Sequence, residues 1–208
     1  MALVKYNNNS LSSVTSAASV SSGAMTHIKT LTASSSSTLS FIDGSSDVVL
    51  DNTYPIYVFK FINIHPANDN TQFAFQVDTG TNTNYNQAIT STTFRTYHYE
   101  AGNDANINYV TGEDQAQGTN FQRLTEGNVG ADNDQSCSGV LHLFNPSSTT
   151  FVKHFIGRAI GSQASDYASE FYSAGYINTT TALTRVQFKM LSGNIDSGTV
   201  KLYGIKDS

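Results

Sequence analysis

The five histidines are the first residues to test for metal or catalytic chemistry. His142 and His154 fall in neighbouring predicted strands, where a hairpin could bring both imidazoles onto one face. A catalytic zinc ion needs three protein ligands, and the sequence contains no HExxH-type spacing that would supply them. We therefore expect these histidines to hydrogen-bond within or at the edge of a sheet, and we predict no metal site.

The acidic residues and the only cysteine give no better signature of catalysis. Two-carboxylate glycoside hydrolases hold their carboxyl groups roughly 5–10 Å apart, and the sequence reveals no pairing among its scattered candidates, Glu100, Glu113, Glu126 and Glu170. Cys137 lies between two serines at the start of a predicted strand, which is typical of a buried, inert thiol. There is no G-x-S-x-G nucleophile elbow. The sequence therefore predicts a protein that is not an enzyme and has no cofactor.

Two turns rich in Asn and Asp, residues 68–70 and 132–134, offer oxygen ligands of the kind that calcium prefers. Neither turn has the spacing of a twelve-residue calcium loop. Hairpin turns favour the same residue types. A calcium role is therefore an open alternative to an ordinary turn.

Tyrosine side chains offer a surface for binding. Phenylalanines at alternating strand positions indicate core, whereas several tyrosines flank polar loops, where an amphipathic ring can cover a partner or stack on a sugar. The candidate contact residues are Tyr97, Tyr99, Tyr109, Tyr167, Tyr172 and Tyr176.

The strand that must centre the fold is PIYVFKFINIHP, residues 55–66. In an extended strand both of its faces are mostly apolar, which predicts burial on both sides or nearly so. Only Lys60 and Asn63 interrupt these faces. Lys60, between Val58 and Ile62, predicts that its face opens toward solvent, a neighbouring carboxylate or another subunit.

Residues 71–79 follow after a turn, and they alternate apolar and polar side chains. We expect them to form a hairpin with residues 55–66. The inward-facing residues are Phe73, Phe75 and Val77, and the outward-facing residues are Gln72, Gln76 and Asp78.

The remaining chain shows turn signals every 8–12 residues and no convincing helix, which indicates roughly ten strands in a sandwich or barrel. Residues 101–135 form a polar connection with short strands expected near 107–111 and 121–125. A connection this long is usually functional or interfacial. We predict an all-β protein, an antiparallel jelly-roll-like β-sandwich over residues 26–208.

An N-terminal arm, residues 1–25, precedes this domain. It is dominated by small and polar residues and cannot bury enough surface to fold alone. It is therefore either a mobile tail or an assembly arm that becomes ordered against a neighbour. Its bulky apolar residues are Leu3, Val4, Tyr6 and Leu11.

Composition excludes several functions. The formal net charge is -5, 13% of residues are charged, and no basic run occurs, so we expect no nucleic-acid partner. No stretch approaches the roughly 20 apolar residues of a membrane span, so we expect no membrane insertion. A single cysteine allows no intrachain disulfide.

Several segments resemble a family of small virion-associated proteins from tailed phages of aquatic bacteria. The most telling are LHLFNPSSTTFVKHF and SGNIDSGTVKLYGI, and the resemblance runs from about residue 25 to residue 205. It implies localisation in the virion as a tail-fibre or capsid-surface protein, and it carries over no catalytic residue.

Together, the residues and the resemblance predict a non-enzymatic bacteriophage structural protein that contacts other virion proteins through its arm. Phage appendages are commonly closed oligomers, so a homotrimer is expected. The alternative is a carbohydrate-binding module for host attachment, which would engage surface glycans through the tyrosines and the 101–135 connection.

Overall fold

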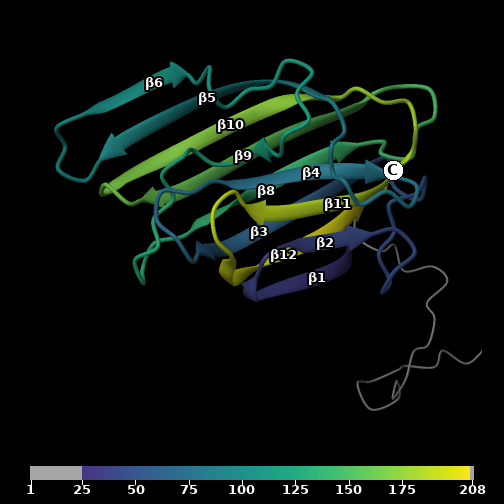
Figure 1. Cartoon of the computed structure of the whole chain (residues 1–208), viewed down its shortest axis with the longest axis horizontal. Coiled ribbons are helices and arrows are strands. Elements are labelled where there is room, and N and C mark those ends of the chain that lie inside the picture. Colours follow the sequence, from purple (N-terminus) through teal and green to yellow (C-terminus); the bar gives the residue numbers. More distant parts are fainter. Residues whose placement is uncertain (1–24, 207–208) are drawn as a thin grey trace, which may run out of the picture.

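Two antiparallel sheets pack face to face in the computed structural model, which describes residues 25–206 (Figure 1). The proposed arm residues Leu3, Val4, Tyr6 and Leu11 lie outside the described residues. The predicted all-β sandwich is confirmed, while the jelly-roll connectivity stays a prediction. All regular structure in residues 25–206 is β, so no helix there could cross a membrane.

The large sheet has eight strands and the small sheet four. The large sheet runs in the order β1 (Met25–Ser36), β12 (Ile195–Ile205), β3 (Ile56–Pro66), β8 (Cys137–Phe144), β9 (Lys153–Gln163), β10 (Tyr167–Ile177), β5 (Ile89–Tyr99) and β6 (Ala105–Tyr109). The small sheet runs in the order β2 (Leu39–Ile42), β11 (Leu183–Met190), β4 (Phe73–Thr79) and β7 (Gln122–Arg123).

Strand β3 lies inside the large sheet, between β12 and β8. The predicted hairpin between β3 and β4 is wrong, because β4 belongs to the small sheet. The two strands instead face each other across the sandwich, where the rings of Phe61 and Phe73 lie 5.2 Å apart. The inward apolar rows of both strands are buried as expected, but they meet face to face rather than side by side. The expected burial of β3 on both faces is wrong, because Ile62 on its outward face is 40% exposed.

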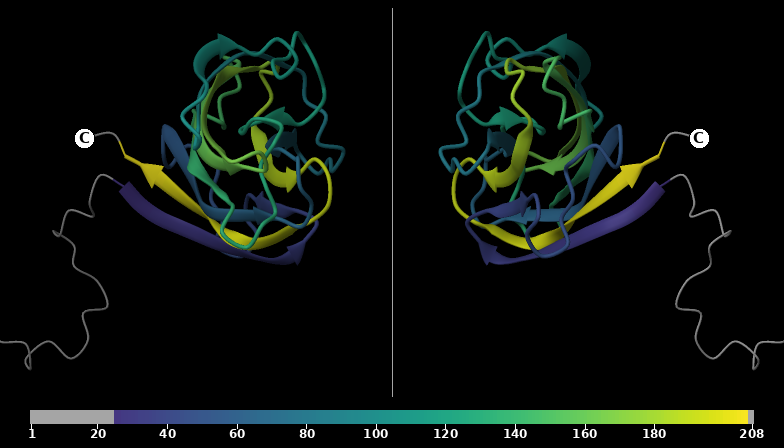
Figure 2. Two further views of the ribbon diagram at one scale, coloured as in Figure 1. Left: turned by 90° about the vertical axis from the view of Figure 1, so that its left-hand side faces the viewer. Right: turned by 90° about the vertical axis from the view of Figure 1, so that its right-hand side faces the viewer.

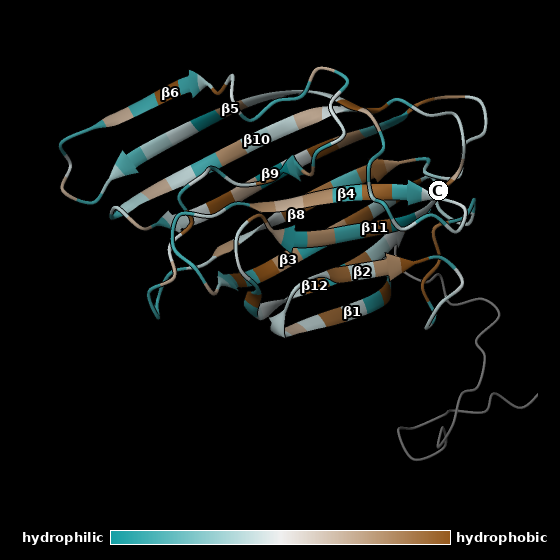
Figure 3. Ribbon diagram, in the orientation of Figure 1, coloured by the Kyte–Doolittle hydropathy of each residue, from teal (hydrophilic) through white to brown (hydrophobic). Residues whose placement is uncertain are grey.

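Phe188 on β11 is the centre of an aromatic core between the sheets. Its ring stacks on Phe73 at 5.6 Å and lies 5.3 Å from Phe59 of the large sheet. Phe41 and Phe75 complete the cluster, and all five side chains are fully buried. Apolar residues accordingly concentrate on the strands of both sheets and polar residues in the loops (Figure 3).

The outward side of β4 is covered rather than exposed. Gln76 and Asp78, which the alternation predicted to face solvent, are both 0% exposed. Gln76 Nε2 donates hydrogen bonds to the carbonyls of Gln87 and Asn120, each at 3.0 Å. The prediction failed because two polar loops fold over this side of the strand and use its polar side chains as anchors.

Lys60 lies on the outward face of the large sheet. It is half-buried, with its ammonium 5.2 Å from the centre of the Tyr203 ring, and neighbouring Ile62 is 40% exposed. This face is open to solvent, as the lysine predicted.

The small sheet covers only part of the large sheet, which is strongly twisted and curved (Figure 2). Aromatic contacts join the small sheet to β3 and β9. Over β5 and β10, residues 110–129 take its place, for example where Thr93 Oγ1 donates to the carbonyl of Val110 at 2.9 Å. The inward rows of β5 and β10 therefore contain polar residues, and apolar residues such as Phe94 point outward.

Gly139 on β8 tests how tightly it packs against its neighbours β3 and β9 in the large sheet. A Cβ atom there would lie 2.3 Å from the carbonyl oxygen of Arg158 and 2.7 Å from the Phe61 ring. We expect Gly139→Ala to lower the free energy of unfolding by about 1–3 kcal/mol, because overpacking forces backbone shifts. Urea denaturation measures the effect. Gly112→Ala is the matched control, since no atom lies within 4 Å of its added Cβ; equal stability of the two variants would contradict the packing described here.

Candidate functional site

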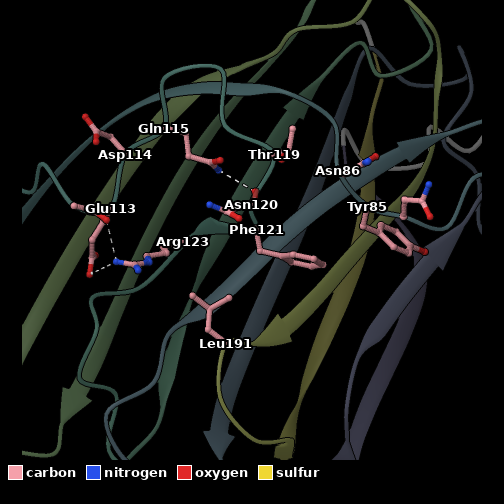
Figure 4. Close-up of a pocket in the computed structure, with 12 residues that line it drawn as sticks. Tyr85, Asn86, Glu113, Asp114, Gln115, Thr119, Asn120, Phe121, Arg123 and Leu191 are labelled. Atoms are coloured by element: carbon pink, nitrogen blue, oxygen red, sulfur yellow. Dashed lines mark hydrogen bonds and ion pairs between the residues drawn. The ribbon is translucent and has the colours of Figure 1, made fainter.

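A polar pocket of about 440 Å³ opens among the loops that cover β4 and β5 (Figure 4). Three short segments and one residue after β11 form its walls. The lining residues are Asn84, Tyr85, Asn86, Gly112, Glu113, Asp114, Gln115, Thr119, Asn120, Phe121, Arg123 and Leu191.

Strand β4 positions two of these walls. Asp78 accepts hydrogen bonds from the Tyr85 backbone N–H at 2.9 Å and from the Gln87 side chain at 3.1 Å. Gln76 donates a hydrogen bond to the backbone carbonyl of Asn120. Because both anchors are buried on a regular strand, they fix the backbone of these two walls.

Glu113 is the most perturbed group in the pocket. Its side chain is 9% exposed, and one of its oxygens lies 3.0 Å from the Arg123 guanidinium. Burial raises the pKa of Glu113 above its usual value, although Arg123 opposes the shift. The second carboxyl oxygen is buried and has no hydrogen-bond partner within residues 25–206.

An aromatic side chain crosses the pocket. Phe121 is half-buried and extends between Tyr85 and Leu191 (Figure 4). Its ring centre lies 6.5 Å from that of Tyr85, and the Lys189 ammonium lies 5.3 Å away over the ring. The pocket thus combines an apolar platform with amide, carboxylate and guanidinium groups.

A second polar cluster joins residue Glu126 of the long connection to strands β5 and β10. Arg95 on β5 forms an ion pair with Glu126, whose side chain is 4% exposed. Ser169 donates a hydrogen bond to the same carboxylate at 2.6 Å, and Tyr167 donates one at 3.2 Å. With all these partners and little exposure, Glu126 holds the connection on the sheet rather than facing a substrate.

Three of the six candidate tyrosines lie on the inward side of the large sheet. Tyr97, Tyr99 and Tyr167 form an aromatic cluster, with the Tyr99 and Tyr167 rings 4.8 Å apart. Tyr167 is 4% exposed, and its hydroxyl accepts a hydrogen bond from Asn128. Tyr167 thus contacts the end of the connection, whereas the Tyr97 hydroxyl donates a hydrogen bond to Asp104.

The other three, Tyr109, Tyr172 and Tyr176, occupy outward positions of the large sheet. Tyr172 stacks on Phe94 at 4.5 Å, and Tyr109 is 50% exposed. None of the six lines the polar pocket. The structure therefore divides the predicted contact residues between an internal cluster and an outward surface.

The histidines do not gather into a metal site. His142 and His154 lie on adjacent strands at diagonal positions of one face, in the register that pairs His142 with Ile156. Residues 25–206 contain no group of three or more His, Cys, Asp or Glu side chains placed to hold a metal ion. The two Asn/Asp-rich turns do meet, since Asp69 accepts a hydrogen bond from the Ala131 backbone at 2.6 Å.

The four glutamates separate into two settings. Glu100 is exposed and Glu170 pairs with Arg158 on the outward face. Glu113 and Glu126 both lie on the long connection, and a Cβ on the adjacent Gly127 would lie 3.3 Å from Glu113. Each is held by its own arginine, an arrangement that favours structural roles. That the chain is not an enzyme stays a prediction.

Sequence reasoning missed the pocket residues Asn84, Asn86, Asn120 and Arg123. The available signal was the polar connection itself, whose length already indicated a functional or interfacial segment. The partner wall at residues 84–86 had no such signal, because only the fold of β4 brings it there.

The buried and exposed ion pairs make a direct comparison. We expect Glu126→Ala to lower the free energy of unfolding by about 3 kcal/mol, because it leaves the Arg95 charge without its partner in a mostly buried setting. Glu170→Ala, which breaks an exposed pair whose Arg158 side chain is 60% exposed, should cost about 0.2–1 kcal/mol. Chemical denaturation of both variants measures the difference, and equal losses would contradict a structural role for Glu126.

Cys137 is 1% exposed, and burial raises the pKa of its thiol to about 12. The thiolate is the reactive species, so the native protein should not react with Ellman's reagent at pH 8. The same protein unfolded in guanidinium chloride should titrate one thiol. Rapid reaction of the native thiol would show that β8 opens readily.

No match to this chain was found among protein-family models, curated proteins or solved structures.

Proposed function

We propose that this chain is a non-enzymatic structural subunit of a phage particle, on the tail fibre or the capsid surface, that assembles with copies of itself as a homotrimer. One observation carries the proposal: the outward face of the large sheet exposes several large apolar side chains among its polar ones. The exposed apolar side chains there are Phe94 (40%), Ile107 (65%), Tyr109 (50%), Ile156 (52%) and Ile160 (49%).

These side chains are neighbours on one surface. In the sheet register, Phe94 lies opposite both Tyr172 and Tyr109. Between Ile107 and Ile160 the surface is hollowed by a groove of about 650 Å³. An apolar and hollowed surface is suited to receive the side chains of another subunit.

The polar groups on this face favour a second copy of the same chain as the occupant. Lys60 and Lys201 lie directly opposite each other on adjacent strands, and neither forms an ion pair within residues 25–206. Like charges in this position destabilise a sheet. Another copy of the chain supplies apolar side chains that match those of this face, and closed symmetry limits the number of copies.

The location in a virion rests on the resemblance of segments such as residues 141–155 and 192–205 to phage proteins. The attachment through residues 1–25 rests on the composition of that segment. An arm that docks on another virion protein and an apolar sheet face that joins copies are two separate contacts, so they are compatible within one particle.

The assembly proposal predicts that Ile156→Glu converts the oligomer to monomer, because the carboxylate would be desolvated in the interface. Light scattering coupled to size-exclusion chromatography measures the mass. Phe151→Glu is the control, since Phe151 is 69% exposed but lies in the loop between β8 and β9; it should leave the mass unchanged. A wild-type chain of about 22 kDa at all concentrations would overturn the proposal.

A further inference from the structure

We infer that the polar pocket of Figure 4 is a binding site for a neutral saccharide, a function separate from assembly. The pocket lies among loops outside β4 of the small sheet, whereas the proposed assembly face belongs to the large sheet. Its volume of about 440 Å³ is within the range of small-molecule sites.

The polar lining matches a ligand that carries many hydroxyl groups. Asn84, Asn86 and Asn120 offer amides that both donate and accept hydrogen bonds, which is how a hydroxyl is best satisfied. The second carboxyl oxygen of Glu113 is an acceptor without a partner on a side chain that is 9% exposed. That oxygen is itself buried from solvent, so the amides rather than Glu113 are the groups that a ligand in the pocket reaches.

The charges favour a neutral ligand over a phosphorylated or sulfated one. Arg123 is paired with Glu113, and Asp114 accepts a hydrogen bond from Tyr109. The lining therefore holds two carboxylates and one guanidinium, and the Lys189 ammonium lies 5.3 Å from the centre of the Phe121 ring, over the ring. Positive and negative groups balance, and the one arginine of the lining is already paired with a carboxylate rather than free for an anion.

Phe121 supplies the apolar platform that distinguishes a saccharide from other polar ligands. A pyranose ring has a face of C–H bonds that packs on an aromatic ring, while its hydroxyls point sideways toward polar groups. Phe121 lies across the pocket between Tyr85 and Leu191, with the amide residues around it (Figure 4). One ring surrounded by amides is the arrangement that a hexose needs.

The test uses the full chain on an array of neutral and anionic glycans, followed by calorimetric titration of the strongest neutral glycan. We expect binding to at least one neutral hexose-containing glycan and about a tenfold or greater loss of affinity in Phe121→Ala, which corresponds to ~1.4 kcal/mol. Asn86→Ala, an exposed loop variant that should fold normally, should also weaken binding. Phe151→Ala is the control and should bind as the wild type does.

Three results would overturn the inference. They are no binding to any neutral glycan, binding confined to sialylated or sulfated glycans, and neutral-glycan binding that is unchanged in both Phe121→Ala and Asn86→Ala. Each is independent of the oligomeric state, so the assembly proposal and the saccharide site can fail separately.

Discussion

The ion pair between Arg95 and Glu126 is the contact on which one part of this sandwich depends, the part in which residues 110–129 cover β5 and β10. An eight-stranded sheet cannot be covered by a four-stranded one, so the inward sides of β5 and β10 need another cover. Residues 110–129 provide it without regular structure over most of their length, and Glu126 fixes them to the sheet. A buried ion pair adds little net stability, but breaking it leaves an uncompensated charge, so it favours one arrangement of the connection.

That cover has a consequence on the opposite side of the sheet. Since the inward row of β5 carries Thr93 and Arg95 for the connection, its apolar residue Phe94 points outward and stacks on Tyr172. On β9, Ile156 and Ile160 are outward as well. On β5 the outward Phe94 and the polar internal cluster are therefore two results of the same departure from the usual sandwich pattern, whereas β9 keeps Phe155 and Ala159 buried on its inward side.

Alternation along the chain predicted the inward rows of β3 and β4, which are buried, because burial of one row is a local property of a strand. It could not predict their pairing, because Phe61 and Phe73 are equally well buried side by side or across a core. The alternation predicts Gln76 and Asp78 in solvent for a related reason: a polar residue in an alternating strand does not show whether loops from later in the sequence fold over it.

The tyrosines near polar loops separate into inward and outward groups, because proximity to a loop does not determine the face of the strand on which a residue lies. The pocket was beyond sequence reasoning, since residues 84–86 and 119–123 meet only after β4 has anchored both.

The positions of the two proposed surfaces bear on how they would work together. The pocket lies among the loops outside β4 and the proposed apolar face lies on the outward side of the large sheet, and the two adjoin where Tyr109 donates a hydrogen bond to Asp114. A closed oligomer would then present several copies of the pocket toward its surroundings. Single saccharide sites with one aromatic platform bind weakly, and repeated sites on one particle multiply the effective affinity when their spacing matches the ligands. In such a particle the outward apolar side chains of β5 and β9 would join the copies, and the buried polar side chains of β4 would hold the walls of each binding site in place.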